Sequence, residues 1–244
     1  MKHPYSTMKT RHNLQWLYAS VTILILTLGW KFPIMGYLVV AAMTGGFISG
    51  PIAGRWFCGN LCPRGGFLER IISKYSPNKT MPAWANSTKV RIGVLLFLFC
   101  MVGINASRDP ENWQHWGFVF WLVCFVTTTT GAFMAFFWNA RAWCAICPMG
   151  TIQSWVGGGK YNLEIDPELC KSCKKCEKFC PMHLHIIQGK TENIPPQVLF
   201  SKDCIRCGEC EEACSVKTLK LVMNTPCVCP PHVNQYSERR VNDE

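Results

Sequence analysis

The sequence predicts a membrane α-helical fold, in which four transmembrane helices form two repeated hairpins and a small α+β domain follows them. Three observations lead to this prediction. Four apolar runs occupy the first part of the 244 residues. The composition is 49% hydrophobic and only 16% charged, whereas soluble domains carry about 25% charged residues. Two matching runs of cysteines then stand close together in the last third of the chain.

The four apolar runs are residues 14–30, 34–54, 92–106 and 117–138. A helix needs about 20 residues to cross a hydrocarbon core of ~30 Å, so the third run requires some of its neighbours to span. In the second run, Gly46, Gly50 and Gly54 recur at every fourth position. Because small residues at this spacing let helix backbones approach closely in lipid, we expect a helix contact face there.

The net charge of +10 is unevenly distributed. Residues 1–159 hold 13 Lys and Arg in total against 3 Asp and Glu, whereas residues 160–244 hold 12 basic and 12 acidic residues. An excess confined to the apolar half indicates membrane topology and argues against a nucleic-acid partner. We therefore expect a multi-pass protein of the cytoplasmic (inner) membrane. Its two termini, the basic loop 55–91 and the domain after the last span should all lie on the cytoplasmic side.

The cysteine runs follow the spacing C-x2-C-x2-C-x3-C twice, which is typical of bacterial ferredoxins with two clusters. In such runs the fourth cysteine ligates the other cluster. Neither a zinc site nor a disulfide framework would produce two matching runs of four. The first [4Fe-4S] cluster is accordingly assigned to Cys170, Cys173, Cys176 and Cys214, and the second to Cys204, Cys207, Cys210 and Cys180.

The predicted organisation has five parts. They are a basic cytoplasmic N-terminus (1–13), a four-helix membrane domain (14–156), a glycine linker expected to be flexible (157–162), a ferredoxin domain for two [4Fe-4S] clusters (163–223) and a Pro-rich tail (224–244).

A second set of cysteines follows the second and fourth apolar runs. Cys58 and Cys62 precede Pro63, and Cys144 and Cys147 precede Pro148, with an arginine and an aromatic residue before each pair. The two segments form an internal repeat at the membrane edge. Together the four thiols could ligate a third iron–sulfur cluster or another metal, form redox-active dithiols, or only stabilise turns. We expect Cys100 and Cys124 to be packing residues within spans, and Cys227 and Cys229 to belong to a mobile tail.

Four spans, Cys-Pro motifs after the second and fourth, and two ferredoxin runs together resemble the NapH family of membrane ferredoxin-like proteins, with its relatives NosR and CcoG. That family's motif is C-x3-C-P in both copies, and here only the Cys58 copy fits, since two residues separate Cys144 from Cys147. The resemblance implies an electron-transfer subunit linked to quinol that serves a partner oxidoreductase, or a reductase used in cofactor maturation.

These observations predict a membrane electron-transfer subunit between the quinone pool and the redox subunit of a respiratory complex, and the candidate activity is that of a quinol dehydrogenase subunit. The alternatives are a metal reductase or maturation factor and, with less support, a redox sensor. No residue is predicted to be catalytic. Ionisable groups for quinol chemistry would be Arg55, Arg64 and Glu69 on the cytoplasmic rim or Asp109, Glu111 and His115 outside. Haem is not expected, because no apolar run has an interior histidine. His183 and His185 follow Cys180 and either are solvated or tune a cluster.

Overall fold

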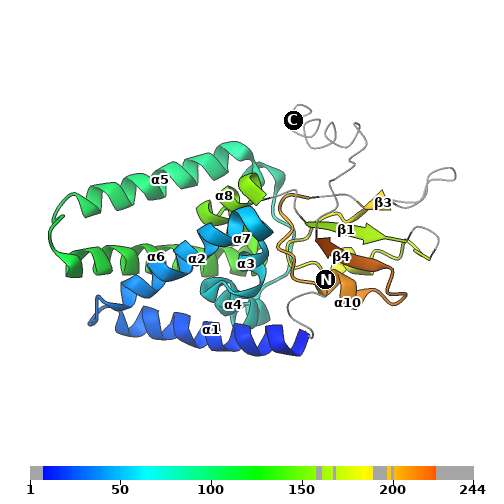
Figure 1. The fold of residues 1–244 in the computed structure, drawn as a ribbon, viewed down its shortest axis with the longest axis horizontal. Helices are drawn as coiled ribbons and strands as arrows, with labels where there is room; N and C mark the ends of the chain where they lie inside the picture. The colour runs from blue at the N-terminus through cyan, green and yellow to red at the C-terminus, as the bar shows by residue number, and fades with distance from the viewer. Residues whose placement is uncertain (1–7, 158–160, 167–168, 189–196, 199–200, 224–244) are drawn as a thin grey trace.

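The structure, a computed structural model, describes all residues except 1–7, 158–160, 167–168, 189–196, 199–200 and 224–244. Four long helices lie side by side and make up one half of the molecule, while short strands and helices make up the other (Figure 1). The long helices are α1 (Met8–Leu28), α2 (Met35–Ala53), α5 (Thr88–Ala106) and α6 (Trp113–Phe137). Short helices lie between the two halves.

Three of the long helices, α2, α5 and α6, are long and apolar enough to cross a membrane. Helix α5 extends the short third apolar run at its N-terminal end to 19 residues, about 28 Å at 1.5 Å per residue. In the described part of the chain, helix α1 does not meet this criterion for a membrane helix. Its first two turns are polar, and they bury Arg11 and Gln15 near α4 (Pro63–Arg70). The chain is therefore mostly helical with three candidate membrane helices, and the four-span arrangement stays a prediction.

The internal repeat is visible in the short helices. Each of α2 and α6 is followed by a five-residue helix, α3 (Trp56–Asn60) or α7 (Ala142–Ile146). The second cysteine of each motif then directly precedes the proline that begins the next helix, α4 or α8 (Pro148–Gly157). Proline suits a first helical position, where its missing N–H would have no helical partner. The 3-10 turns η1 (Ile72–Tyr75) and η2 (Ala83–Asn86) complete the loop before α5.

The glycines of α2 form a helix contact, as predicted, and their partner is α8. Gly46 and Gly50 are buried, and a Cβ at either position would meet the side chain of Gln153 at 3.1–3.3 Å. Gly157, at the end of α8, packs against Gly50 and Gly54. The glycine spacing thus brings the second Cys-Pro segment against the helix that leads into the first.

The other half contains two small antiparallel sheets. Strand β1 (Tyr161–Ile165) pairs with β4 (Leu219–Met223), and β2 (Ile187–Gln188) pairs with β3 (Gln197–Val198). Helices α9 (Lys175–Lys178) and α10 (Glu209–Ala213) each lie within one cysteine run, where they carry its third cysteine, and they pack on each other. The core of this half consists of Cys176, Ile186, Ile187, Cys210 and Leu219.

Only part of the predicted glycine linker is described. Gly157 ends α8 and Tyr161 begins β1, so residues 158–160 between them lie outside the described residues. The predicted tail, 224–244, with Cys227 and Cys229, also lies outside them. The described end of the linker is a packed segment, because the Gly157 carbonyl accepts a hydrogen bond from Arg206 at 3.3 Å.

Candidate redox site

The two Cys-Pro motifs are joined by a reciprocal pair of buried arginines. Arg141, at the start of α7, donates to the carbonyl of Cys58 in the other motif at 2.8 Å. Arg55, at the start of α3, donates to the carbonyl of Cys144. Glycines make room for both side chains: a Cβ at Gly65 would lie 2.6 Å from Arg141 Nη1, and one at Gly150 would lie 2.8 Å from Arg55 Nη2. Each repeat therefore holds the backbone of the other.

All four cysteines of these motifs line one cavity of about 470 Å³. Most of its remaining wall residues come from the four long helices, and the walls are almost entirely apolar. They include Tyr18, Val21 and Ile25 of α1, Leu38 and Met43 of α2, Leu98 and Phe99 of α5, and Phe120 and Val123 of α6. The cavity thus has an apolar body between the long helices and a thiol-rich end beside the short helices α3 and α7.

Polar groups reach this cavity at its thiol-rich end. The Arg64 guanidinium donates to Thr127 Oγ1 at 2.7 Å and to Cys147 Sγ at 3.1 Å, and it lies over the Trp143 ring at 5.5 Å. No carboxylate pairs with Arg64 among the described residues. Thiols, a hydroxyl and an aromatic face are therefore its partners beside an apolar space.

The thiols at the cavity are held by their surroundings. The Cys58 thiol donates to Gln153 Oε1 at 2.9 Å, and Gln153 in turn donates to the Gly46 carbonyl at 2.6 Å. Burial raises the pKa of both Cys58 and Cys62, although Arg55 and Arg64 respectively oppose this shift. As free thiols these two side chains are therefore protonated at neutral pH.

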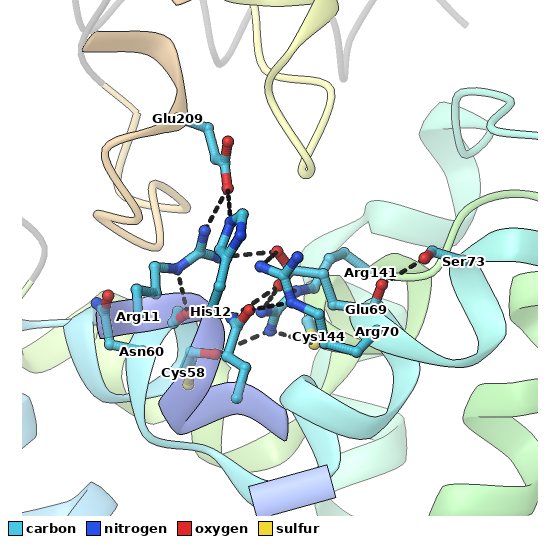
Figure 2. A network of polar contacts seen from close by, with 12 residues as sticks. Arg11, His12, Cys58, Asn60, Glu69, Arg70, Ser73, Arg141, Cys144 and Glu209 are labelled. Carbon is cyan, nitrogen blue, oxygen red and sulfur yellow. Dashed lines mark hydrogen bonds and ion pairs between the residues drawn. The ribbon is translucent and has the colours of Figure 1, made fainter. Parts of the chain in front are cut away.

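Glu69 is the centre of a buried polar network (Figure 2). It accepts hydrogen bonds from Arg11 at 2.8 Å, from Gln15 at 3.2 Å and from Arg141 Nε at 3.0 Å. Burial by itself would raise the pKa of Glu69, but Arg141 and Arg11 together lower it to about 2. The network therefore holds an ionised carboxylate that orients Arg141, and through it the Cys58 carbonyl.

The half of the molecule after α8 contains both cysteine runs and is called the ferredoxin half, and the half up to the end of α8 is called the membrane half. The ferredoxin half contacts this site through its second cysteine run. Ile205, 2% exposed, packs with Cys58, Cys207 and Met182. A Cβ at Gly59 would collide with the Ile205 carbonyl oxygen. Only glycine at position 59 therefore allows the two backbones to lie this close.

Charged side chains hold the same contact. Arg206, 1% exposed, donates to the Ala53 carbonyl at 2.8 Å and occupies the space where a Cβ of Gly54 would lie. Asp203 pairs with Arg55 at 2.8 Å and with Arg91. Glu209 pairs with Arg11, and Figure 2 shows it approaching Arg11 and His12 from the ferredoxin side. Residues of the second run thus contact both the repeat arginines and the Glu69 network.

Cysteines of both ferredoxin runs lie close together in the core of the ferredoxin half. Burial raises the pKa of Cys210, and nearby thiols raise it further. These thiols belong to Cys207, Cys204, Cys180 and Cys176. Thiols of both runs therefore lie near Cys210, and the division of the eight cysteines between two clusters stays a prediction. Cys176 and Cys210 belong to this core, Cys170, Cys180 and Cys214 pack against it, and Cys173 is exposed.

These residues fit [4Fe-4S] clusters by their donor type and by their spacing along the chain. Across the residues that the structure describes, no group of three or more His, Cys, Asp or Glu is positioned to hold a metal ion. A cluster takes its thiolates at the corners of a cube, which spaces the ligands more widely than a single ion does.

Other residues singled out from the sequence lie elsewhere. Asp109 and Glu111 are exposed in the turn between α5 and α6, and His115 contacts the Asn105 carbonyl at 2.8 Å, so none of them lines the cavity. His185 is exposed. His183 meets Asn78 at 3.3 Å. The predicted packing role is wrong for Cys100, which is exposed on the outer face of α5, while Cys124 lines the cavity.

Several site residues were not identified from the sequence. The equivalence of Arg141 and Arg55 in the repeat could have indicated paired roles. Gln153, Asp203 and Arg206 carry no local signal, because the side-chain partners described above are 49 to 153 positions away.

Comparisons with known proteins agree with these observations. A family model described as a 4Fe-4S dicluster domain matches residues 162–215. Another, described as a 4Fe-4S binding domain, matches twice, at residues 35–82 and 116–165. The double match coincides with the two Cys-Pro repeats. No solved structure matches.

Among curated proteins, an uncharacterized protein of Methanocaldococcus jannaschii is 26% identical over 168 residues, covering 67% of this chain and 62% of its own length. The ferredoxin-type protein NapH of Escherichia coli is 35% identical over 81 residues, and that of Haemophilus influenzae is 31% identical over 86. These two matches cover 31% and 33% of this chain and 27% and 29% of the NapH proteins. The matches support a NapH-like iron–sulfur membrane protein.

Proposed function

We propose that this chain is a membrane-bound electron-transfer subunit that relays electrons between the quinone pool and a partner oxidoreductase through its [4Fe-4S] clusters. The observation that carries the proposal is the apolar cavity of about 470 Å³, with four cysteines at the end where the second ferredoxin run is docked. Ligand pockets of this kind are typically ~300–1,000 Å³, mostly apolar, and contain a few polar groups that fix orientation.

The cavity suits a quinone because its two ends differ. The apolar walls from α1, α2, α5 and α6 match an isoprenoid tail, while Arg64 and Thr127 offer polar groups to a headgroup. An arginine donates hydrogen bonds to a quinone carbonyl and stabilises negative charge on its oxygen. Of the ionisable candidates on the rim, Arg64 alone is among the residues that line this cavity in the described part of the chain.

The contact between Cys58 and Ile205 connects the cavity to the ferredoxin half. When bound, [4Fe-4S] clusters supply one-electron carriage and no substrate chemistry. The task of the chain's own residues is then to hold the two halves at a constant separation. Arg206, Asp203 and Glu209 do this by pairing with the membrane half, and Ile205 excludes water from the contact.

We also propose that Cys58, Cys62, Cys144 and Cys147 hold a third iron–sulfur cluster. They line one cavity, and Arg55, Arg64 and Arg141 lie close to them. Such cations stabilise the negative charge of a thiolate-ligated cluster. Iron analysis of anaerobically purified protein tests this assignment directly: about 12 Fe per chain supports it, whereas about 8 Fe restricts the protein to the two ferredoxin clusters.

The quinone site is tested by mixing the purified, lipid-embedded protein with a menaquinol analogue and following cluster reduction by electron paramagnetic resonance. Wild-type protein should be reduced. Arg64→Met should be reduced at least about tenfold more slowly, because a hydrogen bond to the headgroup is lost. The exposed Arg108→Met is the matched control and should behave as wild type.

Reduction by dithionite checks that every variant retains its clusters. Absence of quinol reduction in wild-type protein, with a partner oxidoreductase present, would overturn the quinone assignment. Equal rates for Arg64→Met and Arg108→Met would show that the headgroup does not bind at Arg64.

A further inference from the structure

The loops of the two cysteine runs have the same backbone shape. In the first run, Ser172 and Lys174 have φ values of 49° and 57°. At the equivalent positions of the second run, Arg206 and Gly208 have φ values of 54° and 81°. These left-handed positions turn both chains in the same way. The two loops therefore differ mainly in the side chains that they present.

The second loop shows how this shape serves as a contact surface. Ile205 and Arg206, the two residues after its first cysteine, are 2% and 1% exposed because they insert into the membrane half. Ile205 contacts the first Cys-Pro motif, and Arg206 bonds the end of α2. A loop of this shape thus docks on a protein surface within this molecule.

The first loop presents an exposed and cationic surface instead. Lys171, Lys174, Lys175 and Lys178 are all exposed, as is Cys173. Leu169 and Phe179, at its two ends, are 58% and 57% exposed. Within the described residues no ion pair is recorded for these lysines. The acidic residue of the loop, Glu177, turns inward and accepts hydrogen bonds from the Ile186 and Ile187 amides at 3.0 and 3.1 Å.

We propose that this loop, Leu169–Phe179, is the docking surface for an acidic redox protein. The proposal rests on the electron-transfer part of the proposed function and is independent of the quinone site. Cations around two exposed apolar side chains match the polar rim and apolar centre of a transient interface. Charge complementarity would steer an acidic partner to this loop. The exposed Cys173 would bring the partner near the first cluster's ligands.

The test uses cytochrome b5, an acidic one-electron acceptor, as the probe, and cytochrome c, a basic one, as its counterpart. Full-length holoprotein in nanodiscs of zwitterionic lipid is reduced with dithionite. In each transfer the protein loses one electron and one ferric haem becomes ferrous. Binding of oxidised cytochrome b5 to unreduced holoprotein is measured separately by surface plasmon resonance, so that docking is read without electron transfer.

The test variant is Lys171→Glu/Lys175→Glu, and the matched control is Lys202→Glu/Lys220→Glu, which reverses two exposed lysines elsewhere in the same half. We expect the test variant to weaken cytochrome b5 binding and slow its reduction by at least about tenfold, and to speed cytochrome c reduction. Salt at about 0.5 M should remove most of the difference. The control should resemble wild type.

Equal effects of the two double variants on cytochrome b5 would overturn the proposal, as would independence from salt. A second experiment measures the binding of wild type and both variants to vesicles that contain an anionic phospholipid. If the test variant loses vesicle binding while cytochrome b5 binding is unchanged, the loop contacts lipid and the proposal fails. Cluster reduction by the menaquinol analogue, measured without any partner, reports on the quinone site alone and separates the two hypotheses.

Discussion

The first and second cysteine runs have the same cysteine spacing and the same left-handed turns, yet they present very different surfaces. Where the second run has Ile205 and Arg206, both buried against the membrane half, the first has Lys171 and Ser172. Cysteine spacing therefore sets the loop shape and the ligands. The residues between the cysteines determine whether a loop binds its own protein or stays exposed for another.

Among substitutions in the two runs, Ile205→Asp should have the largest effect on the docking of the ferredoxin half. It removes a buried side chain and places a carboxylate next to Cys58, which should cost about 4 kcal/mol of docking free energy. Lys171→Asp, at the equivalent exposed position, should cost almost nothing. Native-state hydrogen exchange of residues 205–209 measures the difference. Similar protection of this segment in both variants would contradict the buried contact.

Glu69→Gln should have the next largest effect. It should lower the free energy of unfolding by about 3 kcal/mol, because two buried arginines lose their carboxylate partner. Exposed Glu111→Gln is the control. Since the folded-state pKa of Glu69 is about 2 and its ordinary value is 4.5, its contribution should be constant above pH ~4.5 and be lost as the pH falls toward ~2. Denaturant unfolding of the lipid-embedded protein at pH 7 measures the loss. Equal midpoints for both variants would show that the Glu69 network does not stabilise the fold.

Arg206→Ala should weaken docking by about 2 kcal/mol, since the carbonyls of Ala53 and Gly157 lose a charged donor. Ser172→Ala, at the equivalent position of the exposed run, should leave docking unchanged. Limited proteolysis between α8 and β1 provides the measurement, and faster cleavage is expected only for Arg206→Ala. Equal cleavage rates would remove Arg206 from the docking contact.

The smallest effect is expected from Asp203→Asn, about 1 kcal/mol, because Asp203 is partly exposed and its pairs with Arg55 and Arg91 are screened by salt. The effect should shrink as the salt concentration rises. The same proteolysis assay at low and high salt tests this, and an effect that grows with salt would contradict an ion-pair origin.

Features that depend on short sequence separations were predictable. The cysteine spacing indicated the cluster-binding runs, the apolar runs matched α2, α5 and α6, and the Gly46–Gly50 spacing indicated a close helix contact. Family similarity to iron–sulfur proteins agrees with these predictions.

Features that depend on distant partners were not predictable. The basic loop 55–91 indicated topology, yet Arg55 and Arg91 also pair with Asp203, more than 100 positions later in the chain. In α1, the polar residues Arg11 and Gln15 pack near α4 and lower the hydropathy, so α1 is not among the candidate membrane helices of the described residues. Docking of one half on the other is set by such long-range pairs, which no local pattern records.

The opposite environments of the two runs can be measured most directly by hydrogen–deuterium exchange on full-length holoprotein in nanodiscs. Cluster ligation protects both loops, so the comparison isolates the docking contact. The Arg206 and Cys207 amides should exchange at least about a hundredfold more slowly than those of Ser172 and Cys173. Equal exchange in the two loops would contradict a ferredoxin half that is docked through its second run and exposed at its first.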